Sequence, residues 1–177
     1  MRLSRHSKKF DFRHWVIAAA VPFALVQSPI ASADAASAVD APSGTHEIKA
    51  LTATGVQVYA CEYDAAHQLG WKFKSPLASL YDDRGQLTVH HFAGPTWRAG
   101  DGSAIKAKVA AQAPSPTPGA IPWLLLSVTA HSGKGLLSKV QYVRRIDTVG
   151  GTAPSTPCVK EHDKGESPYF ARYVFLE

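Results

Sequence analysis

The chain has 177 residues, with 19 Lys and Arg against 14 Asp and Glu, 45% apolar residues and two cysteines. Its length fits one domain, and its apolar share is that of an ordinary folded globule. These values exclude a disordered tail, a collagen-like repeat, a zinc-ribbon protein and a polytopic membrane protein.

The first 33 residues have the pattern of a secretory signal. Five basic residues precede an apolar run over residues 15–26, and Ala31-Ser32-Ala33 supplies the small-residue cleavage pattern. The run is shorter than the about 20 apolar residues that a membrane-spanning helix needs. We expect a protein exported to the periplasm or the medium, with no stable membrane span after cleavage; an uncleaved anchor is the alternative.

Cleavage would remove most of the positive charge. Residues 1–33 hold five of the 19 Lys and Arg and one of the 14 Asp and Glu, which leaves 14 against 13, or about +1. A nucleic-acid binder would cluster basic residues on its mature domain. The longest basic run there is Arg144-Arg145, so we expect no nucleic-acid partner.

Most of the mature chain has the two-residue period of strands. Residues 34–44 are small and polar and predict a flexible lead, and residues 45–177 form the single expected domain. Strands are predicted over residues 56–64, 69–73, 77–82, 87–92, 105–113, 123–130, 136–148 and 169–176. The nearly continuous apolar run at 123–130 is typical of a strand buried on both faces. Four prolines within residues 113–122 predict an extended surface connection.

These short segments predict an all-β protein. No segment shows the 3.6-residue apolar stripe of a long helix. About eight to nine short antiparallel strands, separated by turns, favour a single-domain β-sandwich or a closed β-barrel.

The two cysteines, Cys61 and Cys158, both follow the predicted signal. In an exported protein a pair of cysteines is typical of a disulfide. The alternative is two free thiols acting as metal ligands or as a nucleophile.

Several segments resemble a known family. They are His90-His91-Phe92-Ala93-Gly94-Pro95-Thr96-Trp97 followed by Asp101-Gly102-Ser103, residues 55–61, residues 121–126, and residues 145–151 with Pro154 and Cys158 after them. In this order they are similar to a secreted family of bacteria and fungi catalogued as domain of unknown function 3455. The resemblance covers about residues 44–176 and implies export and a β-rich single domain. It brings no established reaction, ligand or catalytic residue.

The densest polar cluster lies between His90 and Ser103. His90, His91 and Asp101 have the donor atoms that zinc or copper accepts. Neighbouring strand residues point to opposite faces, however, so at most one of the two histidines can enter a single site. We therefore predict one hydrogen-bonded histidine and one solvated histidine, with no metal and no cofactor. A metal site is the alternative interpretation.

Two further residues are candidates for ligand contact. An exposed Trp97 beside Asp101 would form a stacking platform with a carboxylate, as sugar-binding sites often need. The alternative is two turns that flank a short strand, with the indole buried. Arg145 shares a strand face with Gln141 and Val143. If it is buried it needs a carboxylate partner, with Asp147 or Glu62 available, and otherwise it lies exposed at a strand end.

The sequence therefore favours a binding or envelope-associated module rather than an enzyme. The expected partner is a small ligand, such as a carbohydrate, or a component of the cell envelope. Candidate contacts are His90, His91, Trp97, Asp101 and Arg145. One alternative is a small metal-assisted enzyme that uses His90 or His91 with Asp101. Another is a structural or stress-protective surface protein without a ligand.

Overall fold

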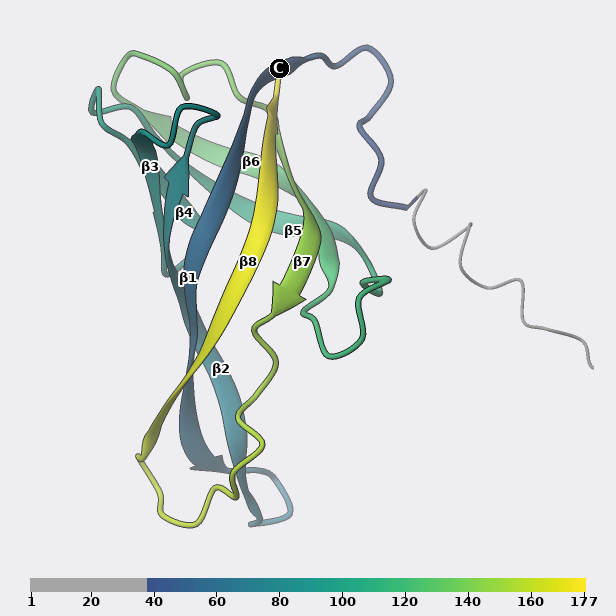
Figure 1. Ribbon diagram of the computed structural model, residues 1–177, viewed down its shortest axis with the longest axis vertical. Coiled ribbons are helices and arrows are strands. Elements are labelled where there is room, and N and C mark those ends of the chain that lie inside the picture. Colours follow the sequence, from purple (N-terminus) through teal and green to yellow (C-terminus); the bar gives the residue numbers. More distant parts are fainter. Residues whose placement is uncertain (1–37) are drawn as a thin grey trace, which may run out of the picture.

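The computed structural model describes residues 38–177, so the predicted signal at residues 1–33 lies outside the described part. Eight strands follow one another: β1 (Glu47–Tyr63), β2 (Leu69–Tyr81), β3 (Leu87–Phe92), β4 (Thr96–Ala99), β5 (Ala104–Ala113), β6 (Trp123–Ser132), β7 (Tyr142–Gly150) and β8 (Lys164–Leu176). The all-β prediction is confirmed (Figure 1). Within residues 38–177 no helix has the length and apolar character to cross a membrane.

The strands form a closed antiparallel barrel in simple chain order. Each strand pairs with the next, and β8 returns to pair with β1, for example at Ala53 and Ala171. Of the two predicted architectures the barrel is therefore the correct one. Closure leaves the barrel with an inner and an outer face, which alternate along every strand.

The predicted strand boundaries differ from the observed ones in several places. Strand β1 begins at Glu47 rather than near residue 56, and β8 begins at Lys164 rather than near residue 169. Residues 69–73 and 77–82 belong to one strand, β2, because Pro76 lies where β2 has a strand neighbour on one side only. The short strand β4 lies between two turns, as the simpler interpretation of residues 94–103 predicted. Strand β7 begins at Tyr142 rather than near residue 136, because residues 133–141 form a loop.

Side chains fill one half of the barrel interior. Leu51, Leu80, Val89, Ile105 and Phe175 are fully or almost fully buried there. Leu137 and Val140, from the loop between β6 and β7, are also fully buried and belong to the same core. The hydrophobic core is thus concentrated toward the end of the barrel that carries the β6–β7 loop.

The outer face of β5, β6 and β7 is covered by the segment just before β1. Val39 is fully buried in a small second cluster with Ala113 and Leu125, against which Trp123 and Tyr142 pack. The part of the predicted lead that the structure describes is therefore docked on the barrel. This contact explains the continuous apolar run of β6, because Leu124 and Leu126 face inward while Trp123 and Leu125 face the docked segment.

Strands β1, β2 and β8 are much longer than β3 and β4 and extend beyond them, as the lower part of Figure 1 shows. In this extension Cys61 of β1 forms a disulfide with Cys158 of the β7–β8 loop, with their Cα atoms 5.4 Å apart. The predicted disulfide is confirmed. It ties the β7–β8 loop to the far end of β1.

The wall of the barrel is interrupted where the β3–β4 hairpin ends. Strand β2 pairs with β3 only over Ala78–Tyr81, and β4 pairs with β5 only up to Lys106. Among the described residues, the rest of β2 pairs only with β1 and the rest of β5 pairs only with β6. A gap without strand pairing therefore separates these parts of β2 and β5. Phe73 of β2 and Val109 of β5 are each about half exposed beside it, at 53% and 49%.

Candidate functional site

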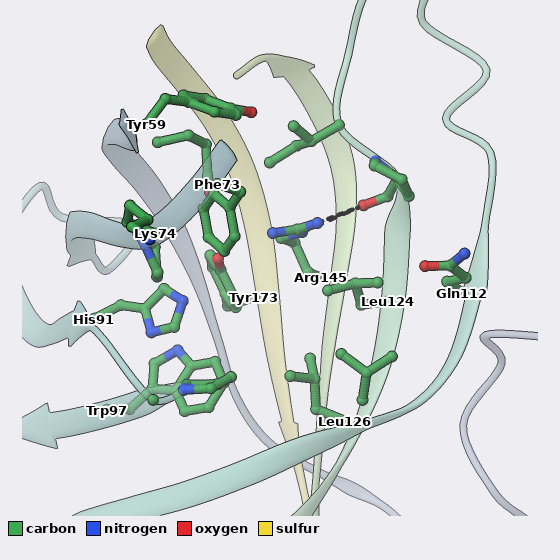
Figure 2. Close-up of a pocket in the computed structure, with 17 residues that line it drawn as sticks. Tyr59, Phe73, Lys74, His91, Trp97, Gln112, Leu124, Leu126, Arg145 and Tyr173 are labelled. Carbon is green, nitrogen blue, oxygen red and sulfur yellow. Dashed lines mark hydrogen bonds between the residues drawn. The ribbon is translucent and has the colours of Figure 1, made fainter. Parts of the chain in front are cut away.

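The unfilled half of the barrel contains a cavity of about 480 Å³. All eight strands contribute to its lining: Gln57 and Tyr59 from β1, Phe73 and Lys74 from β2, His91 from β3, Trp97 from β4, Val109 and Gln112 from β5, Leu124 and Leu126 from β6, Arg145 from β7 and Tyr173 from β8. This volume lies within the range of small-molecule sites, which are concave and mostly apolar with a few polar groups. The cavity is therefore the candidate functional site (Figure 2).

His91 and Trp97 form one wall of the cavity. They are opposite each other on the paired strands β3 and β4, and their rings stack with centroids 4.2 Å apart and an interplanar angle of 6°. The ring of Tyr173 meets both edge-on, at 5.3 Å from His91 and 6.0 Å from Trp97. Edge-on and stacked arrangements are the favourable ones for aromatic rings, so the three rings stabilise one another in this wall.

His91 is neutral at neutral pH. Its Nδ1 lies 3.0 Å from the carbonyl oxygen of Thr96, which can only accept, so Nδ1 carries the proton. Burial lowers the pKa of His91 to about 4; the hydrogen bond to Thr96 opposes this shift and the positive charge of Arg145 adds to it. His91 therefore presents an uncharged aromatic surface to the cavity.

The hydroxyls of Tyr59 and Tyr173 and the amide of Gln57 bring further polar groups to the cavity, and Tyr169 lies behind Tyr173 outside the lining. Tyr59 donates to the carbonyl oxygen of Gly151 at 2.7 Å, and the hydroxyls of Tyr169 and Tyr173 lie 3.3 Å apart. Burial raises the pKa of all three tyrosines, and the charge of Arg145 opposes each rise, so the hydroxyls stay protonated. The side chain of Gln57 is 2% exposed, and its amide nitrogen has no hydrogen-bond partner in the described part of the chain.

Gly151 makes the close packing beside Gln57 feasible. It has a φ of +82°, and a Cβ atom there would lie 2.9 Å from Cβ of Tyr169 and 3.2 Å from Cγ of Gln57. Only glycine combines this backbone conformation with this spacing. The β7–β8 loop, which the disulfide holds, thereby reaches the buried end of Tyr59 and Gln57.

Arg145 brings a positive charge to the cavity. Its Nε and Nη2 donate to the carbonyl oxygen of Pro122, at 3.3 and 2.9 Å. Figure 2 shows the guanidinium extending from β7 toward the side of the cavity where Phe73 and Tyr173 lie. In residues 38–177 it forms no ion pair with Asp147, with Glu62 or with any other carboxylate.

The predicted site residues separate into two groups. His91, Trp97 and Arg145 all line the cavity, whereas His90 is exposed on the outer face of β3, as strand alternation predicted. Trp97 is fully buried and Asp101 lies in the β4–β5 turn, outside the cavity lining. The expected exposed platform of Trp97 and Asp101 is therefore not formed, because barrel closure turns the indole inward.

Asp101 has a structural role instead. Its Oδ1 accepts hydrogen bonds from the backbone N–H and the hydroxyl of Ser103, at 2.9 and 2.6 Å, and its Oδ2 accepts from the N–H of Leu136 at 2.7 Å. These hydrogen bonds lower the pKa of Asp101, the one from the Ser103 hydroxyl most strongly. The carboxylate thus joins the β4–β5 turn to the β6–β7 loop.

The geometry brings no metal-ligand set together. Residues 38–177 contain no group of three or more His, Cys, Asp and Glu side chains arranged to hold a metal ion. His90, His91 and Asp101 point to different parts of the molecule, so the expected pairing of one histidine with Asp101 does not occur.

Sequence reasoning missed Gln57, Tyr59, Phe73 and Tyr173 as cavity residues. One signal was present in β1, where Gln57, Tyr59 and Cys61 alternate with the aliphatic residues Val56, Val58 and Ala60. The aliphatic face is the more usual inner face, yet here the polar and aromatic face points inward. An inward face of this kind is typical of a strand that lines a site rather than a packed core.

A comparison with family models found one match, "Protein of unknown function (DUF3455)", over residues 42–177. Comparisons with curated proteins and with solved structures found no match. The matched residues include every strand and every residue that lines the cavity. The chain therefore belongs to the DUF3455 family of proteins of unknown function.

Proposed function

We propose that this protein is an exported binding protein that holds a small, largely apolar ligand inside its barrel. The observation that carries the proposal is the cavity of about 480 Å³, lined from all eight strands and reached through the gap beside Phe73 and Val109. Protein interiors are normally packed without voids of this size. A hollow half next to a well-packed half is therefore what a ligand site in a barrel requires.

The lining favours an apolar body over a carbohydrate. Its walls are rings and aliphatic side chains, including Phe73, Trp97, Leu124 and Leu126. A sugar would bury many hydroxyl groups, each of which needs a hydrogen-bond partner. The few polar side chains around the cavity suit a ligand with one polar end.

Export is supported by two features. The signal pattern of residues 1–33 precedes the domain, and the disulfide between Cys61 and Cys158 suits an oxidising compartment. A protein of the periplasm or the medium would meet its ligand outside the cytoplasm.

The proposal is tested with N-phenyl-1-naphthylamine, a neutral dye whose fluorescence rises in apolar surroundings. We expect saturable binding to the purified, disulfide-bonded protein. Leu124→Trp fills the cavity with a larger side chain and should abolish the fluorescence rise. Leu87→Trp adds the same ring at a half-exposed position outside the cavity and should leave the rise unchanged.

Two results would overturn the proposal. One is the absence of saturable binding to the wild-type protein. The other is equal binding by both folded variants, because it would place the dye outside the barrel. Thermal melts of both variants establish that each is folded.

A further inference from the structure

Two adjacent arginines of β7, Arg144 and Arg145, lie on opposite faces of the strand and have different partners. Arg144 is on the outer face, where its Nη2 lies 3.1 Å from Oδ1 of Asp40 and its Nε donates to the carbonyl oxygen of Val39 at 2.7 Å. Arg145 is on the inner face, and its hydrogen-bonding partners among the described residues are uncharged: the carbonyl oxygen of Pro122 and the hydroxyl of Tyr173. A guanidinium has five N–H donors, so Arg145 keeps donors for a ligand.

The described part of the cavity lining carries no negative charge. None of the described residues that line the cavity is Asp or Glu. Lys74, the other cation of the lining, already pairs with Glu62 at 2.6 Å. Among the described residues of the lining, the half-buried Arg145 therefore carries a positive charge without a carboxylate partner. It faces a mostly apolar space, where it can attract an anion.

Gln57 provides an independent second donor. Its side chain is almost completely buried and lines the same cavity, yet its amide nitrogen has no hydrogen-bond partner within residues 38–177. A buried donor without a partner costs free energy and is rare in folded proteins. An acceptor on a ligand would remove that cost.

Aromatic rings define the shape of the remaining space. The stacked pair of His91 and Trp97 forms one wall, and Tyr59 and Phe73 form an edge-on pair with centroids 5.9 Å apart near the gap. Flat rings on several sides favour a flat apolar body, which can stack on one ring and meet another edge-on.

We infer that the ligand of this cavity is a carboxylic acid with a flat apolar body, whose carboxylate binds Arg145. This inference rests on the proposed function and narrows it to a class of ligand. The amide of Gln57 donates to a second acceptor of the ligand. Arginine suits this role because its planar donor pair matches the two oxygens of a carboxylate.

The single charge selects a carboxylate over a phosphate monoester. A phosphate group carries close to two negative charges at neutral pH and commonly needs several donors or cations. Within residues 38–177, the lining of the cavity offers one cation without an ion pair, Arg145, and an uncharged histidine. The single negative charge of a carboxylic acid matches the single positive charge of Arg145.

The inference is tested by displacing N-phenyl-1-naphthylamine with three compounds that share one ring system: 2-naphthoate, 2-naphthamide and 2-naphthyl phosphate. We expect the wild-type protein to bind naphthoate at least about tenfold more tightly than naphthamide, as a charge-assisted hydrogen bond to a partly buried arginine implies. Naphthyl phosphate should bind more weakly than naphthoate.

Variants of Arg145 and Arg144 test which arginine causes the preference for naphthoate over naphthamide. The ratio of the naphthoate and naphthamide affinities should fall to near one in Arg145→Gln and be partly retained in Arg145→Lys. Arg144→Gln removes the same charge one residue away on the opposite face and should keep the wild-type ratio. Because each ratio is measured within one variant, a general change in stability or cavity shape cancels.

The outcomes distinguish the two proposals. If the neutral dye binds but naphthoate and naphthamide bind equally, or if Arg145→Gln keeps the preference, the carboxylate inference is overturned and the proposed function stands. A preference for naphthyl phosphate over naphthoate overturns the choice of ligand class. If the dye itself does not bind, the proposed function fails.

Discussion

The imidazole ring of His91 lies flat against the indole ring of Trp97, 4.2 Å away, inside a closed barrel. The pairing of β3 with β4 places the two residues directly opposite each other. This contact joins the packed half of the barrel to the hollow half, because Trp97 belongs to the hydrophobic core and both residues line the cavity.

The burial of His91 predicts a dependence of stability on pH. Its pKa is about 4 in the folded protein, against an ordinary 6.5, so between these values the unfolded chain binds a proton that the folded chain does not. The contribution of His91 is present above pH 6.5 and is lost as the pH falls to about 4. The loss amounts to about 3 kcal/mol.

Chemical unfolding of the wild-type protein, His91→Gln and His90→Gln between pH 7 and pH 4 measures this loss. The free energy of unfolding should fall less steeply in His91→Gln than in the wild-type protein. His90→Gln changes the exposed neighbour and should follow the wild-type protein. Parallel curves for the wild-type protein and His91→Gln would contradict the burial of a neutral imidazole.

The disulfide predicts a large loss of stability in the double variant Cys61→Ala, Cys158→Ala. The two cysteines are 97 residues apart, so the bond removes much of the entropy of the unfolded chain. We expect the free energy of unfolding to fall by about 4 to 5 kcal/mol in the chain-entropy model. Urea titrations with and without reductant check this: reductant should lower the wild-type midpoint toward that of the double variant and leave the double variant unchanged.

Asp101 is predicted to stabilise the fold without contacting the ligand. Asp101→Ala should lower the unfolding midpoint more than Asp82→Ala does. Asp82 also accepts two backbone hydrogen bonds, from Arg84 and Gln86, but both belong to its own turn. Asp101 in addition accepts from Leu136, 35 residues away.

The affinity of Asp101→Ala for N-phenyl-1-naphthylamine should equal that of the wild-type protein, because Asp101 is not part of the cavity lining. A loss of binding in a folded Asp101→Ala protein would place Asp101 in the site after all.

The docked segment before β1 predicts a cost for truncating Val39. Val39→Ala removes two buried methyl groups and should lower the free energy of unfolding by about 1.5 kcal/mol. Val159→Ala makes the same change at a side chain that is 75% exposed and should have little effect. Equal effects in urea unfolding would show that the segment is not held on the barrel.

The class of fold followed from the sequence because its signals are local. The two-residue period, the turn at Asp101-Gly102 and the prolines of residues 113–122 depend on neighbouring residues. The opposite orientations of His90 and His91 followed from the same strand geometry. The disulfide followed from the presence of two cysteines in a chain whose first 33 residues predict export.

The cavity did not follow from the sequence, because it depends on contacts between distant segments. Trp97 was expected to be either exposed beside Asp101 or buried between turns, and barrel closure decides between these alternatives. Arg145 was expected to pair with a carboxylate if it was buried. In the structure Arg145 donates to the carbonyl oxygen of Pro122, and Asp147 is exposed, with a left-handed backbone conformation at the irregularity of β7.

The central claim, that a ligand occupies the barrel interior, is tested most directly by the nuclear magnetic resonance signals of side-chain N–H groups during a titration with N-phenyl-1-naphthylamine. The indole signal of Trp97 and the amide signals of Gln57 should shift and saturate together. Trp123, packed on the outer face, and Trp71, whose indole donates to the carbonyl of Thr156, should not shift. Unchanged signals of Trp97 and Gln57 at saturating dye, with shifts confined to Trp71 or Trp123, would contradict the account.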